Sequence, residues 1–221
     1  DGSVPDPRIL YMDIDSNTWV TAQHPLHHWS KASSDGVGPG LNFALEVRKH
    51  FPARTIGLVP CIFGGTDIKL WQKTSLLEDS LYNYTLKRAQ LAKQRGTIRS
   101  ILWLQGESDS GLKDRANAYS ERLTRFIQDF RTDIDMPELP FICATIGSFL
   151  RKAKEVELFW PFLGKYKWPY SDQINDVLLG ISNAVPNAAC TDTRDITGHI
   201  GDYLHFNAAS QELIGKRMAE D

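Results

Sequence analysis

The stretch Trp103-Leu104-Gln105-Gly106-Glu107-Ser108-Asp109 decides how the chain is interpreted. It ends an apolar run, residues 98–104, that is typical of a buried strand, and it changes at once to amide, carboxylate and hydroxyl groups. In an α/β sheet, ligands bind at the carboxyl ends of the strands, and polar groups are costly to bury without partners. The stretch therefore predicts a polar site at a sheet edge. The alternative is that its polar residues only cap the next helix.

The composition is that of an ordinary globular chain. The 221 residues are 42% hydrophobic and 24% charged, with a formal net charge of −2. This length is enough for a single domain over residues 1–221 with a sizeable core. No basic excess favours nucleic acid as a partner, and no apolar run approaches the roughly 20 residues of a membrane helix. The three cysteines, Cys61, Cys143 and Cys190, are widely spaced, so we expect buried thiols rather than disulfides or metal ligands.

Strand and helix patterns alternate along the chain. Apolar runs predict strands over residues 8–14, 55–59, 98–104, 139–146 and 188–191. Helical spacing predicts helices over residues 41–50, 115–131 and 208–219, one through Leu77 and Leu91 that ends at Gly96, and one that Ser171 caps, with Ile181 facing inward. Asn207 is expected to cap the last helix. This alternation predicts an α/β fold whose parallel sheet is covered on both faces.

Three groups of polar or glycine residues follow predicted strands. Gly64 and Gly65 come after the second strand, Gln105 and Glu107 after the third, and a segment from 202 to 205 precedes the last helix. Paired glycines let a backbone approach a ligand closely or take a positive φ, although a plain turn is the alternative. In a parallel sheet the three groups could converge on one edge.

Two further segments leave their function open. The loop that contains His24, His27 and His28 has no carboxylate or cysteine at a fitting distance in sequence, which favours a solvent-facing or substrate-side loop over a metal site. Residues 148–170 are rich in aromatic side chains. These could stack on sugar rings or pack back on the domain.

In chain order, Gly64-Gly65-Thr66, the stretch from Gln105 to Asp109, and Asp202-Tyr203-Leu204-His205-Phe206 together resemble the motifs of SGNH (GDSL-like) hydrolases. The similarity is greatest to carbohydrate esterase family six, the acetylxylan esterases, and to sialate O-acetylesterase-like relatives. It extends to the flanking segments 8–13, 24–27 and 38–40. The resemblance covers most of the chain and implies a three-layer, flavodoxin-like α/β/α fold that requires no metal or organic cofactor.

The resemblance also implies roles for residues. His205 would act as the catalytic base, for which an imidazole has a suitable pKa range, and Asp202 would orient its ring. Glu107 would orient the ring in place of Asp202 or along with it, or it would hold Gln105 in position. The backbone N–H of Gly65, less so that of Gly64, and the Gln105 amide would donate to the oxyanion. Substrate contacts would come from Thr66, Trp71 and His27.

One element of the family pattern is missing. These enzymes carry the nucleophilic serine in a Gly-Gln-Ser-Asn element after the first strand, and the chain has no such element. We therefore assign no nucleophile. The 221 residues could be part of a longer chain, the element could be on a separate chain, or the protein could be a natural pseudoenzyme. We favour the first, because a sheet without its first strand would expose unpaired edges.

The function expected from this resemblance is a carbohydrate O-acetyl esterase that uses a serine acyl-enzyme mechanism. Acetylated xylan or xylo-oligosaccharide is the favoured substrate, and an O-acetylated sialic acid is second. The alternatives are a general short-chain esterase and a non-catalytic glycan-binding module. A plant polysaccharide substrate would favour a secreted or periplasmic location.

Overall fold

The structure is a computed structural model of the chain and describes residues 4–26, 36–73, 80–152 and 168–221. Its strands form two three-stranded sheets. In the first sheet β1 (Ile9–Met12) lies between β2 (Trp19–Thr21), which is antiparallel to it, and β3 (Ile56–Leu58), which is parallel. The second sheet is entirely parallel, in the order β4 (Ile101–Trp103), β5 (Phe141–Ala144) and β6 (Ala188–Thr191).

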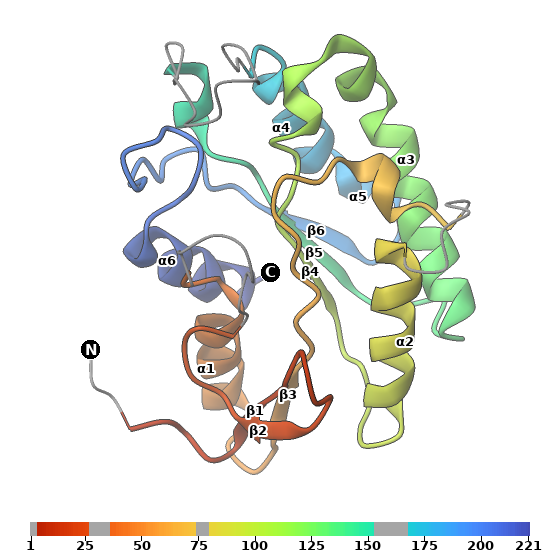
Figure 1. Cartoon of the computed structure of the whole chain (residues 1–221), viewed down its shortest axis with the longest axis vertical. Coiled ribbons are helices and arrows are strands. Elements are labelled where there is room, and N and C mark those ends of the chain that lie inside the picture. The colour runs from red at the N-terminus through yellow and green to blue at the C-terminus, as the bar shows by residue number, and fades with distance from the viewer. Residues whose placement is uncertain (1–3, 27–35, 74–79, 153–167) are drawn as a thin grey trace.

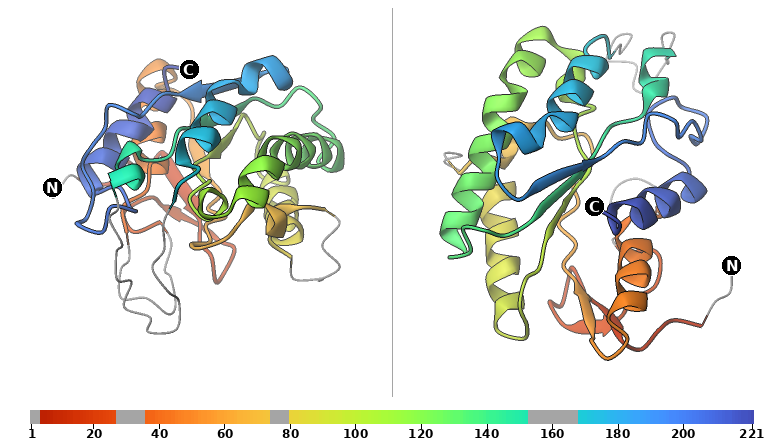
Figure 2. Two further views of the ribbon diagram at one scale, coloured as in Figure 1. Left: turned by 90° about the horizontal axis from the view of Figure 1, so that it is seen from above. Right: turned by 180° about the vertical axis from the view of Figure 1, so that it is seen from behind.

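Helices cover both faces of the second sheet, so the fold has three layers (Figures 1 and 2). On one side α1 (Gly40–His50) packs against α6 (Ala208–Met218), which lies on β5 and β6. The other side holds α2 (Leu81–Lys93), α3 (Lys113–Asp133) and α4 (Ser171–Leu179), with the short α5 (Ile181–Ala184) next to β6. The three α/β/α layers are those predicted for an SGNH-like hydrolase fold, but the expected single sheet is divided into two, of which only the second is entirely parallel.

The core forms where the apolar stripe of α3 meets the second sheet. Tyr119, Leu123 and Ile127 on α3 are completely buried, and Phe126 of the same face packs against Trp103 of β4 with ring centroids 5.0 Å apart. The helical spacing that predicts a helix over residues 115–131 is confirmed, and its apolar residues form the buried stripe. A smaller cluster lies under the first sheet and consists of Ile9, Ala22, Leu26 and Ala44.

The two sheets present open edges. Within the described residues, β3 pairs only with β1, and β4 pairs only with β5. Ile101 and Leu102 of β4 are only half-buried, whereas β5 is nearly all buried, although strands inside a parallel sheet are normally covered on both faces. Beyond the strands the two sheets are joined, because the Gln105 side chain that follows β4 donates to the backbone oxygen of Thr66 at 3.0 Å.

Several local predictions differ from the structure. Strand β2 and the 3-10 helix η1 (Ile68–Trp71) were not predicted. Ser171 does not cap a helix: α4 begins at Ser171 itself, with Tyr170 before it and no side-chain capping bond. The expected single helix through Ile181 is divided at Gly180 into α4 and α5, since glycine weakens a helix interior.

The cap of the last helix is as predicted, because the Asn207 side chain accepts the N–H of Ser210 at 3.0 Å. Leu77, which was expected in the second helix, lies outside the described residues; the described part of that helix starts after Ser80. Cys143 is buried, Cys61 and Cys190 are half-buried, and all three are free thiols. Among the described helices, none combines the length and the apolar character that crossing a membrane requires.

Candidate active site

His205 and Asp202 form a hydrogen-bonded pair in the turn before α6. Asp202 Oδ2 lies 2.6 Å from His205 Nδ1. The other oxygen, Oδ1, accepts the backbone N–H of Leu204 at 2.9 Å and that of His205 at 3.0 Å. The carboxylate therefore fixes both the turn and the ring. With a proton on Nδ1 facing Asp202, the lone pair of Nε2 remains available as a base.

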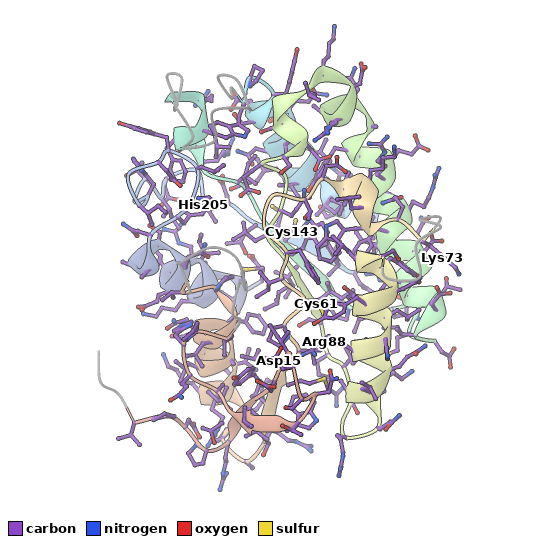
Figure 3. All side chains as sticks on the ribbon, viewed as in Figure 1. Asp15, Cys61, Lys73, Arg88, Cys143 and His205 are labelled. Carbon is purple, nitrogen blue, oxygen red and sulfur yellow. The ribbon has the colours of Figure 1, made fainter. Side chains whose placement is uncertain are left out.

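The electrostatics of this turn keep Asp202 charged. Partial burial raises the pKa of Asp202, but the backbone N–H and the imidazole of His205, together with the N–H of Leu204, outweigh that effect and hold the pKa below its usual value. An anion in this position stabilises the imidazolium that forms when His205 takes a proton. The His205 side chain is 64% exposed and the Asp202 side chain is 29% exposed, so the imidazole is accessible from solvent. Figure 3 shows His205 beside α6 on the outside of the fold.

The loop after β3 presents two exposed glycines. Gly65 has a φ of +69°, a left-handed conformation that favours glycine, and a Cβ there would meet no atom within 4 Å. In the described part of the chain, the backbone N–H groups of Gly64 and Gly65 have no hydrogen-bond acceptor. Unpaired, exposed N–H groups of this kind can donate to an oxyanion.

The Gln105 side chain connects this loop to the end of β4. Its Nε2 donates to Thr66 O at 3.0 Å and to Asp109 Oδ2 at 2.7 Å. The Tyr119 hydroxyl lies 2.8 Å from Gln105 O and 3.1 Å from Gln105 Oε1, both of which can accept from it. Both amide hydrogens of Gln105 thus have acceptors inside the protein. For the amide to donate to an oxyanion, it would have to release one of these two bonds.

Gly106 allows the chain to turn directly after Gln105. Its φ is +148°, and a Cβ at this position would lie 2.6 Å from Ile174 Cγ2 and 3.3 Å from Ile146 Cγ2. Both the backbone conformation and the close approach of α4 therefore require glycine here.

Asp109 is a site residue for which the sequence indicated no role beyond helix capping. It is completely buried, and its Oδ2 accepts the N–H of Ile68 at 2.9 Å as well as the Gln105 amide. Among the described residues, Oδ1 has no hydrogen-bond partner. Burial raises the pKa of Asp109 to about 6, although the bonds from Gln105 and Ile68 oppose the shift. Its position in the stretch after β4 is the signal that could have identified it; Tyr119 carried no such signal, because it belongs to the core stripe.

Glu107 faces the His205 side of the site. Burial raises the pKa of Glu107, and the charge of His205 is among the interactions that oppose the rise. The end of β4 and the turn before α6 are therefore near enough to interact. Of the two tasks considered for Glu107, Asp202 makes the bond to the His205 ring and Asp109 makes the bond to the Gln105 amide.

The three proposed substrate-contact residues differ in their exposure and in whether the structure describes them. Thr66 is half-buried, and its hydroxyl donates to Phe63 O and accepts from Trp71 Nε1. Trp71 is only 5% exposed and packs edge-on against Trp103, with ring centroids 5.2 Å apart. It supports the loop from beneath, so the structure corrects the expectation that it offers a surface to a substrate. His27 lies outside the described residues.

The aromatic segment and one cavity complete the description of this edge. Phe149 and Trp168 are 4% exposed, so both pack back on the domain; residues 153–167 lie outside the described part. A cavity of about 680 Å³ opens beyond β5 and β6, and none of the predicted site residues lines it. Its arginines and aspartates pair with one another. We place the candidate site instead at the Asp202–His205 pair, where an imidazole is oriented and accessible.

The chain thus carries an oriented imidazole and, in another loop, exposed N–H groups on a three-layer α/β/α fold that is consistent with the SGNH-like hydrolases. The chain belongs to the carbohydrate esterase family described as sialic acid-specific acetylesterase, whose model matches residues 1–221.

Known proteins agree with this assignment. The chain is 31% identical over 220 residues to an Arabidopsis thaliana protein named "Probable carbohydrate esterase At4g34215", covering 98% of this chain and 75% of that protein. The crystal structure of the Arabidopsis protein matches with a TM-score of 0.82, covering 98% of this chain and 81% of the other. A carbohydrate acetylesterase from Xanthomonas citri shares the fold, with 19% identity, a TM-score of 0.69, and coverage of 97% and 48%.

Proposed function

We propose that this protein is a carbohydrate O-acetyl esterase in which His205, oriented by Asp202, activates a serine nucleophile. The observation that carries the proposal is the 2.6 Å bond between His205 Nδ1 and Asp202 Oδ2, in a chain that belongs to a carbohydrate esterase family. The bond leaves Nε2 exposed and able to accept a proton, which a base for ester cleavage requires.

The proposed reaction has two steps. A serine Oγ attacks the acetyl carbonyl while His205 Nε2 takes the hydroxyl proton, and the tetrahedral oxyanion is bound by the N–H of Gly65. His205 then gives the proton to the departing sugar oxygen, leaving an acetyl-serine ester. In the second step a water attacks this ester while His205 takes its proton; the tetrahedral intermediate then releases acetate, and His205 returns the proton to the departing serine Oγ. Each oxyanion donor is typically worth about 10²- to 10³-fold in rate.

We further propose that the nucleophile enters on an added parallel strand between β3 and β4. Each of these strands has an unpaired edge within the described residues, and β4 has half-exposed apolar side chains. A strand that paired with both would join the two sheets into one and end at the same carboxyl edge as Gly65 and Gln105. The serine would then lie between the glycine N–H groups and His205.

The substrate class proposed is an O-acetylated saccharide. Acetylated xylan or xylo-oligosaccharide remains our first candidate. An O-acetylated sialic acid is the second, and the description of the family favours this second candidate. The test is acetate release by the full-length protein from both substrates and from a 4-nitrophenyl ester series. Preference for acetyl over butyryl supports a closed acetyl pocket, whereas equal rates across the series indicate a general short-chain esterase.

Two variants test the base. His205→Ala is expected to abolish acetate release, and Asp202→Asn to reduce kcat by about 10⁴-fold, as loss of the orienting carboxylate does in serine hydrolases. His50→Ala, at an exposed histidine at the end of α1, is the control and should retain activity. Wild-type rates that survive His205→Ala would contradict the assignment.

A glycan-binding module without catalysis is the second candidate. It is favoured by one observation: none of the serines in the described segments hydrogen-bonds to His205. Binding of acetylated oligosaccharide by the full-length protein, without acetate release, would support this candidate over the esterase.

A further inference from the structure

His199 organises the turn that carries the Asp202–His205 pair. Its Nδ1 accepts the backbone N–H of Gly201 at 3.0 Å and that of Tyr203 at 3.3 Å. His199 also forms a β-bridge with Phe206, just beyond His205. No sequence pattern indicated this role, because His199 lies outside every motif that pointed to the site.

Two side chains thus divide the backbone donors of the turn between them. His199 accepts from Gly201 and Tyr203, and Asp202 accepts from Leu204 and His205. The turn is closed by the N–H of Ile200, which donates to His205 O at 3.1 Å. Because a hydrogen bond weakens steeply when the acceptor is not aligned with the N–H, the conformation of the turn depends on both side chains.

The turn contains a conformation that needs such support. Tyr203 has a φ of +55°, which is unfavourable for a residue with a side chain. The ring of Tyr203 lies on that of His199, with centroids 4.3 Å apart. The His199 ring also packs against the ring of the buried Phe149, with centroids 5.1 Å apart. The imidazole therefore anchors a strained turn to the core.

We propose that His199 is a positioning residue for the proposed base, His205, and that it acts as a hydrogen-bond acceptor through Nδ1. This inference rests on the function proposed above. An Nδ1 that accepts two N–H groups carries no proton, so His199 is neutral with its proton on Nε2. Loss of the acceptor would release Gly201 and Tyr203, move the backbone of the turn, and separate His205 Nδ1 from Asp202.

Two variants separate the acceptor from the ring. His199→Phe keeps an aromatic ring between Phe149 and Tyr203 but removes the acceptor. His199→Asn removes the ring but places a side-chain oxygen where it can accept the N–H two residues later, as asparagine does in turns. If the acceptor is what positions the base, the asparagine variant rescues what the phenylalanine variant loses. His50→Phe serves as the matched control.

The readout is the imidazole Nδ1 proton of His205 in proton–nitrogen NMR spectra of the 221-residue chain. It needs no turnover, so its outcome is independent of whether the protein proves to be an esterase. We expect the proton signal in the wild type, His50→Phe and His199→Asn, and its loss in His199→Phe. A signal retained in His199→Phe, or lost in both His199 variants, would overturn the acceptor role.

Two further measurements keep the test decisive. The nitrogen shifts of the wild-type His199 ring should show Nδ1 without a proton, and a protonated Nδ1 would overturn the proposal even if a variant failed to fold. In the full-length enzyme, His199→Phe should lower kcat between about 10- and 100-fold with KM nearly unchanged, as expected for a misplaced catalytic group. His199→Asn should recover most of that loss.

Discussion

Gln105 Nε2 donates a hydrogen bond to Asp109 Oδ2 at 2.7 Å, four residues later in the same stretch. Gln105 Nε2 also donates to the backbone oxygen of Thr66, and Asp109 Oδ2 also accepts the backbone N–H of Ile68. The loop after β3 is thus attached to the end of β4 at two points. Because Gly65 lies in that loop, the direction of its N–H depends on a side chain from another sheet.

Asp109 makes the stability of the protein depend on pH. Burial raises the pKa of Asp109 from 3.8 to about 6, so its ionised form is disfavoured in the folded state. Ionisation of Asp109 lowers the free energy of unfolding. This loss is absent at pH values below the pKa of Asp109 in the unfolded chain and grows as the pH rises. Above about pH 6 it is complete and amounts to about 3 kcal/mol. The change that removes it is Asp109→Asn.

The measurement is thermal unfolding of wild type and Asp109→Asn at pH 4.5 and pH 7.5. The melting temperature of the variant, relative to wild type, should be higher at pH 7.5 than at pH 4.5 by roughly 5 °C or more. Other titrating groups cancel in this difference. An equal difference at both pH values would show that Asp109 titrates normally.

Removal of the Gln105 amide should weaken the attachment between the two loops. In Gln105→Leu the buried carboxylate of Asp109 loses one of its two donors, and Thr66 O loses its partner. We expect destabilisation of about 1–3 kcal/mol in denaturant unfolding. Gln128→Leu, at an exposed position on α3, is the control and should change stability little. Equal stability of the two variants would mean that Gln105 does not hold the loop.

The two glycines of the site should respond differently to alanine. Gly106→Ala combines an unfavourable φ with a Cβ 2.6 Å from Ile174, and we expect a loss of about 2–5 kcal/mol. Gly65→Ala introduces only the left-handed strain, because the space around it is open, and should cost about 1–2 kcal/mol. Denaturant unfolding measures both, and a larger loss at Gly65 would contradict the geometry.

The 221-residue chain by itself should neither turn over acetyl esters nor react at this site with a serine-directed phosphonate. The reason is that no Gly-Gln-Ser-Asn element follows any of its strands, although the Asp202–His205 pair and the exposed Gly64 and Gly65 are present. Intact-mass analysis after phosphonate treatment is the measurement. A phosphonylated serine within residues 1–221, mapped by peptide sequencing, would show that a nucleophile was overlooked.

Long periodic patterns made the fold predictable, whereas short elements escaped. The helix from Ala116 to Phe130 is buried on one face only, so its apolar residues recur every 3.6 residues, and this spacing is visible in the sequence. Strand β2 has three residues, of which Trp19 is half-buried and Val20 and Thr21 are exposed, so no alternation was there to detect. Ser171 failed as a cap because its backbone already lies within the helix.

The sequence predicted those site residues that lie within the recognised motifs. The DxxH spacing indicated that Asp202 could reach the ring of His205, and the structure shows the bond. It did not indicate that Asp109 would hold Gln105, since two carboxylates in one short stretch have the same sequence signature and only burial distinguishes them. Tyr119 and His199 were missed because their roles arise from tertiary contacts between segments distant in sequence or outside the motifs.

A crystal structure of the full-length protein, reacted with a serine-directed phosphonate, tests the central claim most directly. We predict a phosphonylated serine on a strand between β3 and β4, one phosphonyl oxygen within hydrogen-bond distance of the Gly65 N–H, and His205 Nε2 beside the modified oxygen. An adduct at another place, or a His205 Nε2 beyond hydrogen-bond distance of the modified serine oxygen, would contradict it, given the short reach of proton transfer.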